Sequence, residues 1–330
     1  MTGSSDVALQ MATLNGAETP VPYCSLRRAA TQDRFAQDSF DFSIPVLQWA
    51  GSFSESEWHR HQNAPPPYGW GGLPAFGSAL SLLNNASSSR LFERGSRDQC
   101  VTCAVVGNGG ILRGSGQGQA IDSHHFVFRV NGAITKGFEE DVGSRTSFYG
   151  FTTNTLKHSL KAYHWDGFRE IPRTPDIRYI FIPVSIRDYV MLTATIQGTT
   201  VPSGEDKGDW PSKYFGYKPP TDKFRMLHPH FIQYVTKRFL NSPLLNMRYG
   251  NLYRPSTGAL MLLTALHTCD KVSAYGFITR NYGDFSDHYY DSVKKPLHFY
   301  ANHDLLMESW LWEFLHWKKL IWLYQRYSRG

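Results

Sequence analysis

The sequence predicts an α/β fold of the Rossmann-like kind, in which helices flank a largely parallel central sheet. Three observations predict it. From position 103 onward, short apolar runs of the length of buried strands recur along the chain. Helical stretches separate these runs, which is the pattern of βαβ units. The first run passes directly into a glycine-rich turn, as strands of phosphate-binding α/β folds do.

The apolar runs give the expected strands in chain order, at 103–107, 126–130, 147–151, 177–183 and 271–277. Two helices follow from the spacing of apolar residues, an amphipathic one over 228–240 and a nearly all-apolar, buried one over 256–269. We expect the aromatic segment 310–326 to form a terminal helix that packs on the core, in preference to a helix lying on a membrane surface.

The N-terminal third of the chain predicts less order. Residues 1–22 are small and polar, and we expect them to be a disordered stem or linker. Residues 23–330 then form one folded domain, irregular up to position 99 except for an interrupted helix within 79–93. No run of 18 apolar residues occurs, so we expect no transmembrane helix in this chain.

The composition favours a small anionic partner over a nucleic acid. The 330-residue chain has a formal net charge of +6. Its lysines and arginines are scattered, without the long basic blocks typical of nucleic-acid surfaces.

The four cysteines allow several interpretations. Cys100 and Cys103 form a C-x-x-C, which fits a redox pair or half of a zinc site. Two disulfides would instead use all four cysteines, including Cys24 and Cys269, and would indicate an oxidising compartment. Asn85 begins an N-x-S triplet, a weak indication of N-glycosylation and of the secretory pathway.

The glycine-rich turn "CAVVGNGG" is not a dinucleotide site. Gly107 and Gly109 match the fingerprint, but Leu112 stands at its third glycine, and Asn131 ends the next strand where an acid should bind ribose. No nucleoside-triphosphate P-loop occurs either. Asn108 and Asn131 remain, at the carboxyl ends of two strands, where they could contact the ribose and base of a nucleotide or simply be turn residues.

Three further stretches carry chemistry. Ser256, Thr257 and Gly258 begin the buried helix, where first-turn amides can bind a phosphate, although Ser256 could be only a cap. His288, within "HYYD", could hold a phosphate leaving group. His303, before a helix, is a candidate general base or a structural histidine. Neither Asp-x-Asp nor H-E-x-x-H occurs, which favours a mechanism without a metal.

Together and in this order, these stretches resemble the four motifs of the animal sialyltransferases, glycosyltransferase family 29. The large motif resembles 103–151, the small motif 253–277, the third motif 288–291 and the very small motif 303–308. "FRVNGAITKGFEEDVGSRTSFYGF" and "PSTGALMLLTALHTC" are most similar to the family's α-N-acetylgalactosaminide α-2,6 subgroup.

The resemblance implies a role for each matching residue. It implies the GT-A-variant sialyltransferase fold and CMP-sialic acid as the donor, with no cofactor. His303 would be the catalytic base. The donor would be bound by Asn108, Asn131, Ser256, Thr257, Gly258, Gly276, Phe277 and His288. Disulfides would join Cys103 to Cys269 and Cys24 to Cys100.

The implied reaction is transfer of sialic acid, with inversion, to O6 of GalNAc linked to Ser or Thr of a glycoprotein. The alternatives are another acceptor or linkage, a catalytically silent binding module and an unrelated nucleotide-binding oxidoreductase. Family members lie in the Golgi lumen as single-pass type II membrane proteins, and we expect the anchor to be absent from this chain.

Overall fold

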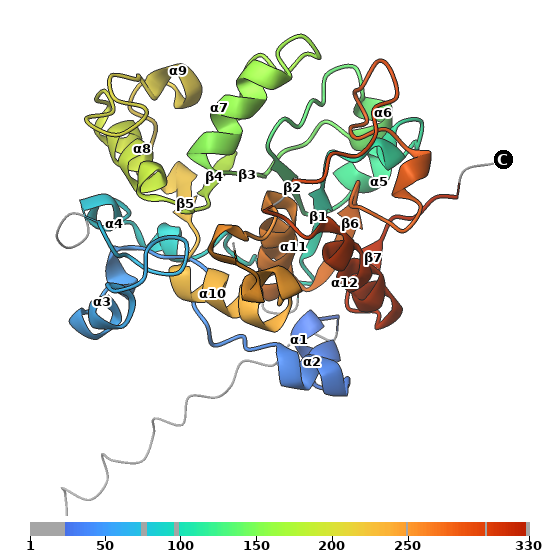
Figure 1. Ribbon diagram of the computed structural model, residues 1–330, viewed down its shortest axis with the longest axis horizontal. Coiled ribbons are helices and arrows are strands. Elements are labelled where there is room, and N and C mark those ends of the chain that lie inside the picture. The colour runs from blue at the N-terminus through green and yellow to red at the C-terminus, as the bar shows by residue number, and fades with distance from the viewer. Residues whose placement is uncertain (1–23, 74–77, 96–98, 249, 301, 328–330) are drawn as a thin grey trace, which may run out of the picture.

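The computed structural model describes residues 24–327 except 74–77, 96–98, 249 and 301, and the expected stem at 1–22 lies outside this part. A seven-stranded sheet forms the centre, with helices on both faces (Figure 1). Its strand order is β5-β4-β3-β2-β1-β6-β7, and all its neighbours pair in parallel. The expected parallel α/β fold is confirmed.

The strands agree with the apolar runs of the sequence, with two additions. The short strands β5 and β7 were not expected, because two or three residues give no recognisable pattern. The strands are β1 (Thr102–Val106), β2 (Phe126–Val130), β3 (Phe148–Phe151), β4 (Arg178–Phe181), β5 (Phe224–Met226), β6 (Lys271–Tyr275) and β7 (Trp322–Leu323).

The helices divide between two hydrophobic cores, one on each side of the sheet. One core includes side chains of α1 (Leu26–Ala30), α2 (Arg34–Ser39), α10 (Pro229–Arg238), α11 (Thr257–Thr268) and α12 (Leu305–Trp317). The other involves α3 (Glu55–His61), α4 (Ser78–Leu82), α5 (Gly118–Asp122), α6 (Glu139–Val142), α7 (Thr153–Ala162), α8 (Ile186–Gln197) and α9 (Ser212–Phe215). The N-terminal third is therefore more helical than expected.

Helix α11 lies in the middle of the first core, as its apolar sequence predicts. All its residues from Ala259 to His267 are buried. A disulfide joins Cys103 in β1 to Cys269 just after α11, and a second joins Cys24 to Cys100, as the resemblance implied. The first disulfide ties the strand before the glycine turn to the end of the helix that begins at Ser256.

The terminal segment differs from the expected single helix over 310–326. Helix α12 ends at Trp317, because Lys319 takes a left-handed conformation with φ +59°, and the chain then pairs with β6 as β7. The expected packing on the core is present, since Trp312 and Leu315 are buried. Within the described residues, no helix is long and apolar enough to cross a membrane.

The topology places a ligand site at one edge of the sheet. From β1 the chain proceeds outward through β2, β3, β4 and β5, and then returns to the other side of β1 as β6. The carboxyl ends of β1 and β6 therefore flank a switch point, where open parallel sheets bind ligands.

Candidate functional site

One pocket of about 440 Å³ lies at this edge of the sheet. It is lined by all nine residues for which the sequence implied a catalytic or donor-binding role: Asn108, Asn131, Ser256, Thr257, Gly258, Gly276, Phe277, His288 and His303. These residues come from the ends of β1, β2 and β6, the start of α11 and the loops before α12. Their meeting in one cavity agrees with a shared role, although their individual roles stay predictions.

The turns after β1 and β6 cross in direct backbone contact. The N–H of Gly107 donates to the carbonyl of Tyr275 at 2.8 Å, and that of Gly109 donates to the carbonyl of Gly276 at 3.0 Å. A Cβ on Gly276 would lie 2.5 Å from the carbonyl oxygen of Gly107, and Gly276 has a φ of +69°. The glycines are thus needed for the close crossing of two turns, which brings the two motifs together.

Two asparagine side chains at this edge have unused polar atoms. The amide of Asn108 donates to the carbonyl of Val130 at 3.2 Å. Asn131 has a φ of +50°, so its role as a turn residue is real. The Oδ1 atoms of both asparagines are buried and have no hydrogen-bond partner among the described residues. Buried polar atoms normally have partners, so these two oxygens indicate a ligand that donates hydrogen bonds, as ribose hydroxyls do.

The start of α11 combines a cap with a buried carboxylate. Ser256 Oγ accepts from the N–H of Ala259 at 3.0 Å and donates to Glu308 Oε2 at 2.7 Å. The backbone N–H of Ser256 donates to the other carboxylate oxygen at 3.0 Å. Burial raises the pKa of Glu308 to about 7, against the effect of these hydrogen bonds. Ser256 is therefore a cap, and the N–H groups of Thr257 and Gly258 are the first-turn donors that line the pocket.

His303 has a geometry suited to a general base. Its Nδ1 lies 2.7 Å from the carbonyl oxygen of Arg254, which can only accept a hydrogen bond, so Nδ1 carries the proton. Nε2 then carries the lone pair. Burial lowers the pKa of His303, which favours the neutral ring, while the bond to Arg254 opposes this. The backbone N–H of Arg254 donates to the carbonyl of Asn302, which joins the segment before α11 to the segment before α12.

His288 is held against the glycine turn by its loop. Gly109 and His288 form an isolated antiparallel bridge, and the N–H of Tyr289 donates to the carbonyl of Asn108 at 3.0 Å. The Nδ1 atom of His288 lies 3.5 Å from Asp287 and 3.9 Å from Asp291. Burial lowers the pKa of His288, and the two carboxylates oppose this shift.

The sequence did not indicate the wall of the pocket that α7 provides. Asn154, Thr155, His158, Ser159 and, just after the helix, Tyr163 line the pocket. The ring of Tyr163 contacts His288 at a centroid distance of 5.0 Å. These polar residues follow no recognisable motif, but they come directly after β3. The rule that ligands bind at the carboxyl ends of parallel strands could have identified them.

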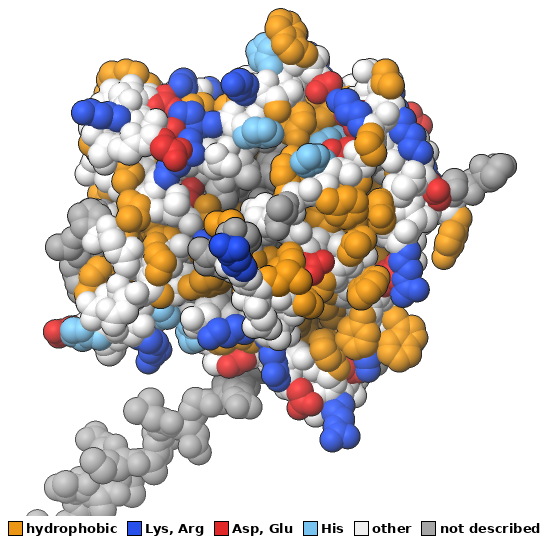
Figure 2. Space-filling view, in the orientation of Figure 1, with side chains coloured by type: hydrophobic (Ala, Val, Ile, Leu, Met, Phe, Trp, Pro, Cys, Tyr) orange, Lys and Arg blue, Asp and Glu red, His pale blue; other side chains and the backbone are white. Residues whose placement is uncertain are grey.

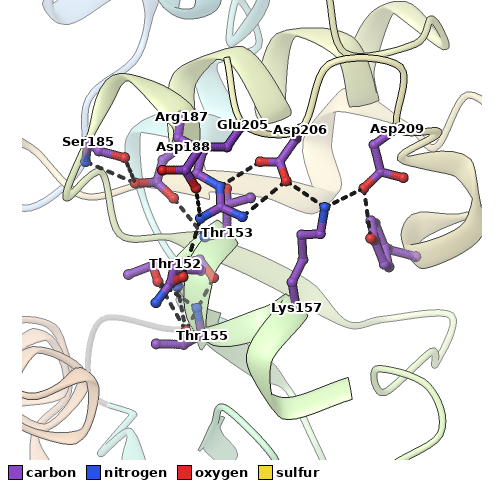
Figure 3. A network of polar contacts seen from close by, with 12 residues as sticks. Thr152, Thr153, Thr155, Lys157, Ser185, Arg187, Asp188, Glu205, Asp206 and Asp209 are labelled. Atoms are coloured by element: carbon purple, nitrogen blue, oxygen red, sulfur yellow. Dashed lines mark hydrogen bonds and ion pairs between the residues drawn. The ribbon is translucent and has the colours of Figure 1, made fainter. Parts of the chain in front are cut away.

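A polar network fixes α7 from its other side (Figure 3). Lys157 and Arg187 both pair with the buried Asp206, at 2.5 and 2.6 Å. Arg187 also donates to the Oδ1 of Asn154 at 3.2 Å, which orients that pocket-lining side chain. The buried Asp188 accepts from the N–H of Thr153 at 2.7 Å and so connects α8 to the start of α7.

Comparison with known proteins identifies the family. Residues 47–320 match the family described as "Glycosyltransferase family 29 (sialyltransferase)". The chain belongs to this family of sialyltransferases. Such enzymes take sialic acid from CMP-sialic acid, so the donor implied by the resemblance is supported. The expected membership is confirmed.

Two relatives carry the same name, "Alpha-N-acetylgalactosaminide alpha-2,6-sialyltransferase 2". The mouse protein is 56% identical to this sialyltransferase over 306 residues, which cover 92% of this chain and 82% of the relative. The human protein is 57% identical over 291 residues, which cover 87% and 78%. Both belong to the subgroup that the motifs resemble, and specifically to its second type.

Solved sialyltransferase structures have the same fold. One, titled "Crystal Structure of a Mammalian Sialyltransferase in complex with Gal-beta-1-3GalNAc-ortho-nitrophenol", is 28% identical and superposes with a TM-score of 0.59. The match covers 89% of this chain and 95% of that chain. Within the described residues of this sialyltransferase, no group of three His, Cys, Asp or Glu side chains is placed to hold a metal ion.

The predicted glycosylation site lies on the surface. Asn85 is exposed at the start of a short 3₁₀ turn, where its Oδ1 accepts from the N–H of Ser87 at 2.9 Å. Its exposure fits a glycan acceptor, and its modification stays a prediction.

Proposed function

We propose that this sialyltransferase transfers sialic acid from CMP-sialic acid to O6 of GalNAc linked to Ser or Thr of glycoproteins, including GalNAc that carries β-1,3-linked galactose. The names of the two mammalian relatives support the GalNAc acceptor and the α-2,6 linkage. The ligand in the solved neighbour's title supports a pocket of this shape for a Gal-β-1,3-GalNAc acceptor.

The observation that carries the mechanism is the tautomer of His303. With its Nδ1 proton held by the Arg254 carbonyl, Nε2 accepts the proton of the acceptor hydroxyl. The acceptor oxygen bonds to the anomeric carbon of sialic acid while the bond from that carbon to the phosphate oxygen of CMP breaks. Attack and departure occur on opposite faces, so the configuration is inverted through an oxocarbenium-like transition state.

The donor is bound by the opposite part of the pocket. The unused Oδ1 atoms of Asn108 and Asn131 accept from the hydroxyls of the nucleoside. The first-turn N–H groups of α11, at Thr257 and Gly258, and the ring of His288 face the phosphate, whose negative charge grows as CMP leaves. These groups perform the charge stabilisation that a divalent metal performs in other glycosyltransferases, so the reaction needs none.

We further propose that residues 23–330 form the catalytic domain and that residues 1–22 are a stem. The enzyme acts in the Golgi lumen, where its family's substrates are made. The two disulfides support an oxidising compartment.

Transfer assays test the proposal directly. CMP-sialic acid is incubated with a GalNAc-peptide, a Gal-β-1,3-GalNAc-peptide and an N-glycan, with and without a metal chelator, and the product linkage is determined. We expect α-2,6-sialylated GalNAc and equal rates with chelator. Transfer to the N-glycan alone would overturn the acceptor assignment. Donor binding without transfer to any acceptor would identify a silent binding module.

A further inference from the structure

The pocket has little permanent positive charge for a donor with two negative charges. CMP-sialic acid has one charge on its phosphodiester and one on the carboxylate of its sugar. No lysine or arginine is among the described residues that line the pocket, whereas the acidic Asp287 and Glu308 are. The remaining basic side chains of the lining are four histidines: His158, His288, His298 and His303. Histidine side chains gather between α7 and the loops before α12 (Figure 2).

Two of these histidines already have roles in the proposed function. His303 must be neutral to accept the proton of the acceptor hydroxyl. His288 faces the phosphate of the donor. His158 and His298 therefore remain as candidates for the carboxylate of sialic acid, which a neutral site would leave without a charged partner.

The chemistry of the donor limits where this partner can lie. The carboxylate and the phosphate oxygen are bonded to the same anomeric carbon. A cation that binds the carboxylate must therefore lie close to the one that binds the phosphate, which is His288, and to the base that acts on the same carbon, which is His303.

His298 meets both conditions through short contacts. Asp287 lies 3.5 Å from His288 Nδ1 and accepts a hydrogen bond from the backbone N–H of His298. The ring of His298 packs on Tyr300 at a centroid distance of 4.4 Å, and Tyr300 lies 6.1 Å from the ring of His303. A continuous set of contacts thus joins His298 to the phosphate-binding histidine and to the base.

His158 fits less well. It lies on α7, where its ring contacts Tyr163 at 6.2 Å, and it forms no ion pair with an acidic side chain in the described part of the chain. An adjacent carboxylate favours the charged form of an imidazole. Asp287 supplies such a carboxylate beside His288 and His298, and its own negative charge would repel the donor if both rings stayed neutral.

We propose that His298 binds the carboxylate of sialic acid as an imidazolium, and that Asp287 is a positioning residue that stabilises the charged forms of His288 and His298. This inference rests on the proposed function. It assigns the two charges of the donor to two neighbouring histidines that share one acid.

Comparing two ligands tests the assignment. CMP has the phosphate but lacks the sugar carboxylate, so binding of CMP and of CMP-sialic acid is measured by calorimetry without acceptor. His298→Gln should weaken binding of CMP-sialic acid by about tenfold or more and leave CMP binding unchanged. His288→Gln should weaken both. His59→Gln, at an exposed position on α3, is the matched control and should change neither.

A second variant tests Asp287 through its effect on charge. Asp287→Asn should make the Michaelis constant for CMP-sialic acid begin to rise at a lower pH than in the wild type, because the histidines lose their protons earlier. An unchanged pH profile would overturn the positioning role.

Other outcomes would overturn the carboxylate assignment. If His298→Gln weakens CMP and CMP-sialic acid equally, or neither, His298 does not recognise the carboxylate. If His158→Gln alone weakens CMP-sialic acid and spares CMP, the carboxylate lies against α7. Failure of the wild type to bind either ligand would instead refute the proposed function, so the two failures are distinguishable.

Discussion

Substitution of Gly276 by alanine tests whether the crossing of the two glycine turns is a requirement of the fold. Gly276 has a φ of +69°, and an added Cβ would lie 2.5 Å from the carbonyl oxygen of Gly107 and 2.7 Å from a methyl group of Leu112. The left-handed conformation costs an alanine about 1–2 kcal/mol. The overlap adds about 1–3 kcal/mol, because a backbone atom must move. We expect Gly276→Ala to lower the free energy of unfolding by about 2–5 kcal/mol in total.

Gly114→Ala is the matched control for this substitution. Gly114 has almost the same φ, +67°, but an added Cβ would meet nothing within 4 Å. This variant should lose only the conformational part, about 1–2 kcal/mol. The difference between the two variants therefore measures the steric part alone.

Urea unfolding at neutral pH, followed by tryptophan fluorescence with both disulfides intact, gives the two free energies. Gly276→Ala should also weaken CMP binding, since Gly107 and Gly109 flank Asn108 and contact this turn. Equal losses of stability in the two variants would refute the argument that the turns must cross this closely.

The other predictions concern the base, the staple and the buried acid. His303→Ala should reduce turnover by about 10²–10⁴-fold while CMP binding survives, and wild-type turnover in this variant would exclude His303 as the base. Replacing Cys103 and Cys269 by serine opens a loop of 166 residues and should lower the free energy of unfolding by about 5 kcal/mol; free thiols at both positions in secreted wild-type protein, detected by mass spectrometry, would contradict the pairing. Because burial raises the pKa of Glu308 from 4.5 to about 7, the unfolded chain ionises first, and this group's contribution to stability falls as the pH rises from about 4.5 to 7. Glu308→Gln cannot ionise and should remove about 3 kcal/mol of that pH dependence in denaturation measured across this range, and an unchanged profile would show that Glu308 ionises normally.

Much of the fold was predictable because its central elements are buried on all sides. Strands β1 to β4 and helix α11 are short or long apolar runs whose pattern needs no knowledge of their neighbours. Strands β5 and β7 were not predictable, because three and two residues become strands only through pairing with an existing sheet edge. The end of α12 was missed for a similar reason, since neither Lys318 nor Lys319 prohibits a helix.

The site shows the same division. Its nine expected residues were recognisable because each motif combines a special backbone position with a polar side chain, as Asn131 does after β2. The polar residues of α7 carry no such pattern, and only the sheet brings them to the pocket. Glu308 was visible five residues after His303, but its contact with Ser256 depends on the packing of α12 against the start of α11.

The chain alone was sufficient to infer the α/β class, the family, the donor and the pairing of the cysteines, since local apolar runs and short motifs contain that information. The tertiary structure decided which groups face one another: the crossing of Gly107 with Gly276, the buried pair of Ser256 and Glu308, and the histidines around Asp287. These contacts join residues far apart along the chain, so they arise only when parallel strands place their carboxyl ends at one edge of the sheet.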